Sequence, residues 1–176
     1  SAIDCVIKNW FKNGGQSTHI MMNSLKKFGK LIGIETGTSE TNPNPVETPR
    51  SVAIFLYEAA RVDNDVTPED LEIAADALAR IVNVTQAKAI DLLQHASRPE
   101  NRPTSYQPLA KIINEQFSYE RKRQLINAMW LVAHSDAHID PHEDHIIRKI
   151  SDLLYVSHRD FIQEKISARE TRNLPH

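Results

Sequence analysis

The chain has 176 residues, of which 40% are hydrophobic and 25% are charged. These values are ordinary for a globular protein and suit one domain with its own core. The single cysteine, Cys5, excludes a disulfide framework and indicates a reducing, cytoplasmic location. No apolar run approaches the roughly 18 residues that cross a bilayer.

The net charge of -2 is unevenly distributed along the chain. Residues 1–34 carry five lysines against one acid, Asp4, and the remainder is acidic. An acidic body argues against nucleic acid as the main partner, because phosphate binding requires a basic face. Residues 1–34 are therefore interpreted as a basic, amphipathic N-terminal segment.

Within this segment, residues 20–34 could form an amphipathic helix on an anionic membrane surface. Its apolar positions recur at helical spacing between lysines, at Met21, Leu25, Phe28 and Ile32. The alternatives are a helix packed on the domain or a flexible tail, since Gly29 and Gly33 weaken the predicted amphipathic helix. Residues 35–49, rich in Thr, Pro, Asn and Glu, are expected to be a flexible linker.

From residue 50 the pattern is helical, which predicts an all-α domain over residues 50–171 with short loops. Apolar stripes at helical spacing run over 52–60, 71–81, 125–133 and 146–154. Further helices are expected over 85–96 and 106–116, and a last one around Phe161, Ile162 and Ile166.

Two segments share the pattern A-x-x-D-x-x-[VI]-x-P-x-[DE] at a shift of 73 residues, 59–73 and 132–146. Each lies between two apolar stripes, which indicates a duplicated helix hairpin. In both copies a proline fits the first helical position, a capping residue precedes it, and an acid three residues after the cap completes a capping box. These residues are Thr67, Pro68 and Asp70 in the first copy and Asp140, Pro141 and Glu143 in the second.

Helix capping does not account for Asp63 and Asp136. Both are expected near the end of the preceding helix, where the helix dipole disfavours an acid. An acid placed there twice requires a compensating lysine, arginine or metal ion. If the two copies pack about a pseudo-twofold axis, Asp63, Asp70, Asp136 and Glu143 could converge.

Known site types fit the acidic turns poorly. An EF-hand loop fails because its sixth position, normally glycine, is Pro68 or Pro141. The zinc-protease pattern H-E-x-x-H is one residue short at His142–His145. The histidines of 134–145 still leave a metal-dependent hydrolase open as an alternative.

The segments 128–168 and 58–78 resemble the tellurite-resistance TerB family, in its stand-alone bacterial branch, whose signature is A-x-x-D-G-x-[IV]-x-x-x-E. The resemblance implies a compact helical bundle of two pseudo-twofold-related hairpins. It also implies acids that bind a divalent cation, here Asp63, Asp70, Asp136 and Glu143. This chain departs from the signature at three positions, with Asn64 and Ala137 in place of glycine and Asp70 in place of glutamate.

The expected function is therefore that of a non-enzymatic helical module. It would bind a divalent cation (Ca, Mg or Mn rather than Zn) or a protein partner through the acidic turns, in a membrane-proximal stress assembly. Peripheral membrane contact would be made by residues 20–34. A second alternative is an ion-free interaction domain, in which Asp136 pairs with a basic side chain such as Arg148 or Lys149.

Overall fold

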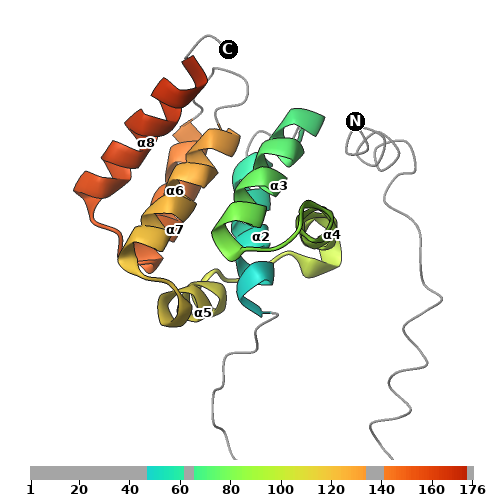
Figure 1. Ribbon diagram of the computed structural model, residues 1–176. Helices are drawn as coiled ribbons and strands as arrows, with labels where there is room; N and C mark the ends of the chain where they lie inside the picture. Colours follow the sequence, from blue (N-terminus) through green and yellow to red (C-terminus); the bar gives the residue numbers. More distant parts are fainter. Residues whose placement is uncertain (1–46, 62–65, 134–140, 174–176) are drawn as a thin grey trace, which may run out of the picture. The chain divides into compact units, whose positions relative to one another are not determined.

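A computed structural model describes residues 47–61, 66–133 and 141–173, with the side chains of 141–144 and 173 excepted. The described residues are helical and contain no strand, which confirms the predicted all-α class (Figure 1). The elements are α2 (Glu47–Ala60), α3 (Pro68–Val82), α4 (Gln86–Ser97), the short 3-10 helix η1 (Pro99–Asn101), α5 (Gln107–Gln116), α6 (Tyr119–Ala133), α7 (Pro141–Leu153) and α8 (His158–Asn173).

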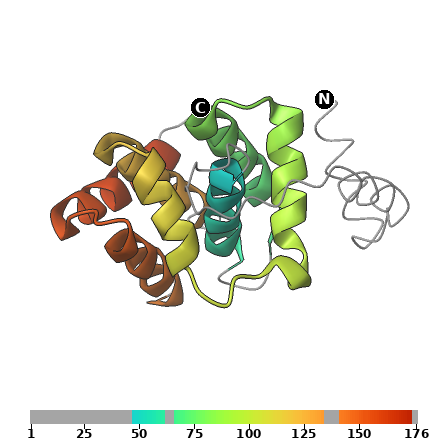
Figure 2. The ribbon, with the colours of Figure 1, turned by 90° about the horizontal axis from the view of Figure 1, so that it is seen from below.

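Helix α2 is the centre of the bundle and contacts α3, α4, α5, α6 and α7. Figure 2 shows α2 in the middle, with α4 on one side and α5 on the other. All residues of 51–60 are buried. Burial on every side explains why this helix is apolar over most of its surface, unlike the amphipathic outer helices.

The predicted repeat is visible in the bounds of the helices. Helix α2 ends at Ala60 and α6 ends at Ala133, while α3 begins at Pro68 and α7 begins at Pro141. Both pairs of bounds are related by the same shift of 73 residues as the sequence pattern. The buried Trp130 of the second copy stands at the position of the buried Tyr57 in the first.

Local chemistry sets several helix ends. Asn83 ends α3 in the left-handed conformation with φ of 55°, a conformation that asparagine tolerates. Thr85 then caps α4 by accepting a hydrogen bond from the Lys88 N–H. Helix α2 begins at Glu47, three residues inside the segment expected to be linker, because Pro49 is tolerated in a first helical turn.

Residues 43–176 form one compact unit. The basic segment 1–34, with its predicted membrane helix at 20–34, lies outside the described residues. None of the helices that the structure describes is long and apolar enough to span a bilayer.

Candidate functional site

Both acidic turns are framed by helix ends at one end of the bundle, the upper end in Figure 1. There α2 and α6 end, α3 and α7 begin, and α8 ends. We call this the acidic end. Asp63 and Asp136 each lie three residues beyond a helix terminus, but both are outside the described residues. Glu143 belongs to the first turn of α7, and its side chain is likewise outside them.

Asp70 is the one predicted site residue whose side chain the structure describes. Its Oδ2 accepts a 2.8 Å hydrogen bond from the Thr67 N–H, and its own N–H donates to Thr67 Oγ1 at 3.2 Å. This confirms the predicted capping box of α3. The carboxylate is only 3% exposed, and its Oδ1 is buried without a hydrogen bond in the structure as described.

A buried carboxylate oxygen without a donor is costly, because it has lost water and gained nothing in return. Capping therefore explains one oxygen of Asp70, and the other has no partner among the residues that the structure describes. An ionised carboxylate only accepts, so an N–H donor, an O–H donor or a cation would satisfy this oxygen. Among the described residues alone, no three His, Cys, Asp or Glu side chains gather closely enough to hold a metal ion.

A second buried acid, Glu58, lies in the last turn of α2, at the acidic end. It is 3% exposed and accepts bonds from Arg61 Nε at 2.8 Å and Arg61 Nη2 at 3.2 Å. Its Oε2 also accepts a 2.5 Å hydrogen bond from the hydroxyl of Tyr106, which precedes α5. Burial, followed by this hydrogen bond, raises the pKa of Tyr106. The hydrogen bond to Glu58 likewise raises the pKa of Arg61.

Arg172 joins the two copies at the acidic end. Its Nη2 lies 2.8 Å from Oε1 of Glu69 in the first turn of α3. Its Nη1 donates to the carbonyl oxygen of Leu131, in the last turn of α6, at 3.5 Å. One guanidinium group thus contacts the start of α3, in the first hairpin, and the end of α6, in the second hairpin.

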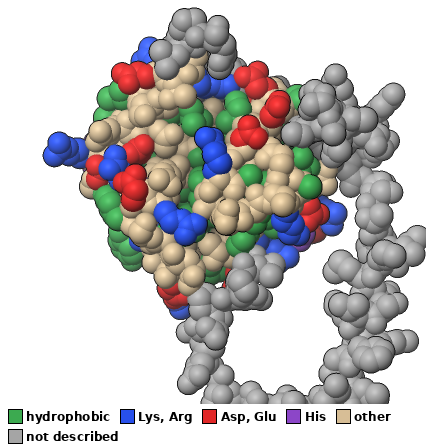
Figure 3. Space-filling model, viewed as in Figure 1, with side chains coloured by type: hydrophobic (Ala, Val, Ile, Leu, Met, Phe, Trp, Pro, Cys, Tyr) green, Lys and Arg blue, Asp and Glu red, His purple; other side chains and the backbone are tan. Residues whose placement is uncertain are grey.

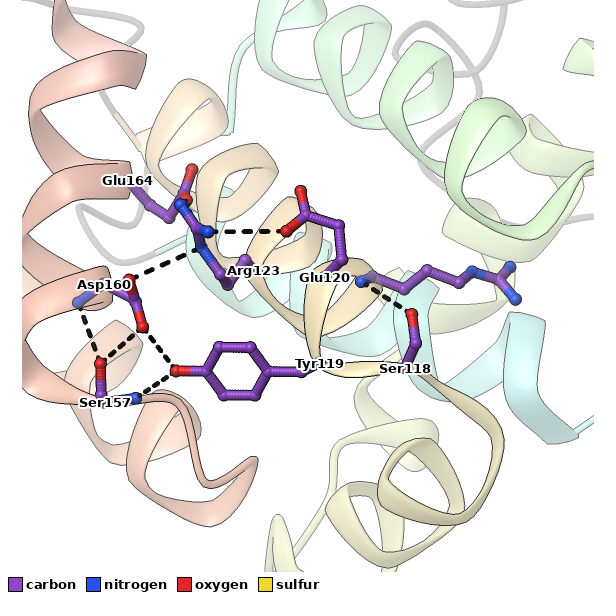
Figure 4. A network of polar contacts seen from close by, with 8 residues as sticks. Ser118, Tyr119, Glu120, Arg123, Ser157, Asp160 and Glu164 are labelled. Carbon is purple, nitrogen blue, oxygen red and sulfur yellow. Dashed lines mark hydrogen bonds and ion pairs between the residues drawn. The ribbon is translucent and has the colours of Figure 1, made fainter.

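At the opposite end of the bundle, α6 and α8 are joined by a polar network (Figure 4). The Tyr119 hydroxyl donates to Asp160 Oδ2 at 2.6 Å and accepts from the Ser157 N–H at 3.0 Å. Arg123 lies 2.6 Å from Glu164. Hydrogen bonds from Ser157 and Tyr119 hold the pKa of Asp160 below its usual value.

Sequence reasoning did not identify Glu58, Tyr106 or Arg172. Ser157 and Asp160 could have been found, because they repeat the capping-box spacing seen at Thr67 and Asp70. Arg172 carries no local signal, since its partner Glu69 is 103 residues away in the chain. Asp136 lies outside the described residues, so its predicted pairing with Arg148 or Lys149 stays a prediction. Arg148 lies 5.2 Å from the Phe161 ring and Lys149 lies 5.6 Å from the Tyr106 ring.

The fold defines an all-helical module built on two copies of a helix hairpin with an acidic turn. The model of the family described as tellurite resistance protein TerB matches residues 50–166. The chain therefore belongs to the TerB family. No curated protein and no solved structure matches it.

Proposed function

We propose that this TerB module binds a divalent cation through the carboxylates of its two acidic turns, without being an enzyme. The proposal rests on Asp70, whose Oδ1 is buried without a hydrogen bond in the described part of the chain. Asp63, Asp136 and Glu143 would supply the other ligands. A set of carboxylate oxygens without cysteine suits the hard ions Ca²⁺, Mg²⁺ and Mn²⁺ better than Zn²⁺.

The charge distribution supports a cation or a protein partner in preference to nucleic acid. Acidic side chains gather over the upper part of α3, while basic and acidic groups are mixed over the rest of the face in Figure 3. The exposed acids of α3 are Glu69, Glu72 and Asp76. A protein partner with a basic surface, in a membrane-proximal stress assembly, would fit the same end of the bundle.

Calorimetric titration of the chain with Ca²⁺, Mg²⁺, Mn²⁺ and Zn²⁺ tests the proposal. We expect saturable heat with at least one of the first three ions. The Asp63→Asn/Asp136→Asn double variant should lose it, because two charged ligands are removed. Wild-type protein that gives no metal-dependent heat would refute the cation site and favour the ion-free interaction domain.

Asp70→Asn gives a sharper test, because asparagine keeps an acceptor for the Thr67 N–H while removing the buried charge. In EDTA we expect an unchanged or higher Tm. Wild-type protein should gain roughly 2.7 kcal/mol of stability from a cation at about 100 times its Kd. Asp70→Asn should lose most of that gain. Thermal scans with and without Mn²⁺ measure both effects, and an equal Mn²⁺ response in the two proteins would contradict the role of Asp70.

A further inference from the structure

The large hydrophobic side chains that remain exposed gather around α8. Among the residues that the structure describes, they are Tyr155 at 78%, Ile166 at 53%, Tyr119 at 45% and Ile162 at 37% exposed. Both isoleucines belong to α8, and Tyr155 lies in the turn before it. The Tyr119 hydroxyl donates to Asp160 in the first turn of α8. Single exposed hydrophobic residues are normal, whereas a group of them on one element marks an interaction surface.

The apolar residues of α8 are divided between two faces. Phe161 is buried and packs on Trp130 of α6, and Ala168 is buried as well. Ile162 and Ile166 are four residues apart, so they form a second apolar stripe on the exposed face. Helix α8 packs mainly on α6 and lies at the outer edge of the bundle in Figures 1 and 2. The second stripe is therefore open to a partner outside the domain.

Charges of opposite sign flank the two isoleucines. Arg159 precedes Ile162 by three residues and Glu170 follows Ile166 by four, which places both charges on the same face of the helix. Both side chains are exposed. In the described part of the chain, the ion pairs of α8 are made by other residues. The stripe thus begins with a cation, continues through two isoleucines and ends with an acid.

A stripe of this kind is complementary to itself. When two α8 helices lie antiparallel about a twofold axis, the isoleucines of one copy meet those of the other. Arg159 of one copy then lies beside Glu170 of the partner subunit, and the same pair recurs at the other end of the stripe. A parallel arrangement would instead bring like charges together, which is unfavourable.

We propose that α8 is a homodimerisation surface, on which a second copy of this chain docks antiparallel through Ile162, Ile166 and the Arg159–Glu170 pairs. The inference is independent of the cation site. Helix α8 has 16 residues and is therefore about 24 Å long. An interface built on one such helix is smaller than that of a permanent dimer, so the association should be weak and concentration-dependent.

Sedimentation velocity of the full chain, from micromolar to millimolar concentration, tests the proposal. We expect a reversible equilibrium between monomer and dimer in the wild type. Ile166→Asp should raise the dimer Kd by about tenfold or more, because it places a charge in the apolar contact of both copies. More than half of the Ile166 side chain is exposed, so the Tm at low concentration should stay unchanged.

Reversal of the flanking charges tests the antiparallel orientation. Arg159→Glu and Glu170→Arg each bring like charges together at both ends of the interface, and each should raise the Kd by about tenfold. The double variant Arg159→Glu/Glu170→Arg restores opposite charges and should restore the wild-type Kd. Within one copy the two residues are about three helical turns apart and cannot pair with each other. Rescue therefore reports a contact between copies.

Lys88→Glu is the matched control, because it reverses an exposed charge on α4, and it should leave the Kd unchanged. A wild-type chain that stays monomeric at millimolar concentration would overturn the proposal. If that monomer binds anionic vesicles and Ile166→Asp abolishes the binding, α8 meets a lipid surface instead of a second copy. A dimer that Ile166→Asp leaves unchanged would overturn the role of α8. Failure of the double charge reversal to restore the Kd would overturn the antiparallel pairing.

Discussion

At the scale of single residues, the two buried acids among the described side chains, Glu58 and Asp70, differ in how they are satisfied. Glu58 accepts three hydrogen bonds, from two nitrogens of Arg61 and from Tyr106. Asp70 accepts a hydrogen bond from the Thr67 N–H with Oδ2, whereas its Oδ1 is buried with no partner among the described residues. Glu58 thus has a complete structural explanation, whereas Asp70 keeps one oxygen that has no partner in the described part of the chain and could bind a ligand.

Removing the Tyr106 hydroxyl should destabilise the domain, because it leaves a buried carboxylate oxygen of Glu58 with one donor fewer. We expect Tyr106→Phe to lower the free energy of unfolding by about 1–3 kcal/mol, measured by urea denaturation. Tyr119→Phe is the control, since Tyr119 is 45% exposed and water can replace its hydroxyl. Equal losses in the two variants would contradict this account of Glu58.

At the scale of elements, α8 is held against α6 by polar groups as well as by the core. Trp130 of α6 packs on Phe161 of α8, with ring centroids 5.6 Å apart. At the start of α8, Ser157 and Asp160 exchange hydrogen bonds, with Ser157 Oγ donating to Asp160 Oδ2 at 2.6 Å and the Asp160 N–H donating back at 3.2 Å. The lowered pKa of Asp160 makes this docking dependent on pH.

The direction of that dependence follows from the lowered pKa. Asp160 contributes stability above its ordinary pKa of 3.8, and the contribution is lost as pH falls through its lower folded value. Asp160→Asn should therefore be less stable than wild type at pH 7, with a difference that shrinks toward pH 3. Urea midpoints at both pH values measure this. A difference that stays constant with pH would mean that the carboxylate charge is not responsible.

The sequence predicted the elements well, because the apolar positions of each helix recur within a few residues of one another. Ile147, Ile150 and Leu154 are buried as their spacing indicated, and Thr67 caps α3 as the motif predicted. The sequence did not predict which residues connect the ends of different helices. The Glu58–Tyr106 bond joins residues 48 apart, and such a pairing depends on packing that no local pattern encodes.

The candidate site was predictable only in part, for the same reason. The repeat identified Asp70 as the acid of a capping box, and the structure confirms this prediction. That its second oxygen would be buried without a hydrogen bond depends on the surrounding helices and could not be read from residues 59–73. Convergence of Asp63, Asp136 and Glu143 with Asp70 stays a prediction.

At the scale of the whole molecule, the TerB domain lies in the compact unit 43–176, and the basic segment 1–34 precedes that unit in the sequence. We therefore expect membrane contact to be separable from the helical domain. The full chain should co-sediment with phosphatidylserine vesicles at low salt, because lysines near an anionic surface contribute about 1 kcal/mol each. Residues 43–176 alone should remain in the supernatant.

The matched variant is the full chain carrying Lys26→Gln, Lys27→Gln and Lys30→Gln. It should lose most of the vesicle binding, while the Tm of the domain stays unchanged. Raising the salt should have a similar effect, since it screens exposed charges. Equal sedimentation of the full chain and of residues 43–176 would contradict a membrane role for the basic segment 1–34.

The ion pair between Glu69 and Arg172 has a consequence for biosynthesis. Its two members are 103 residues apart, and α8 is translated after α2 to α7. Both hairpins have left the ribosome before Arg172 can reach the start of α3. A nascent chain that has made α2 to α7 therefore lacks the Glu69–Arg172 ion pair, which forms only when α8 docks.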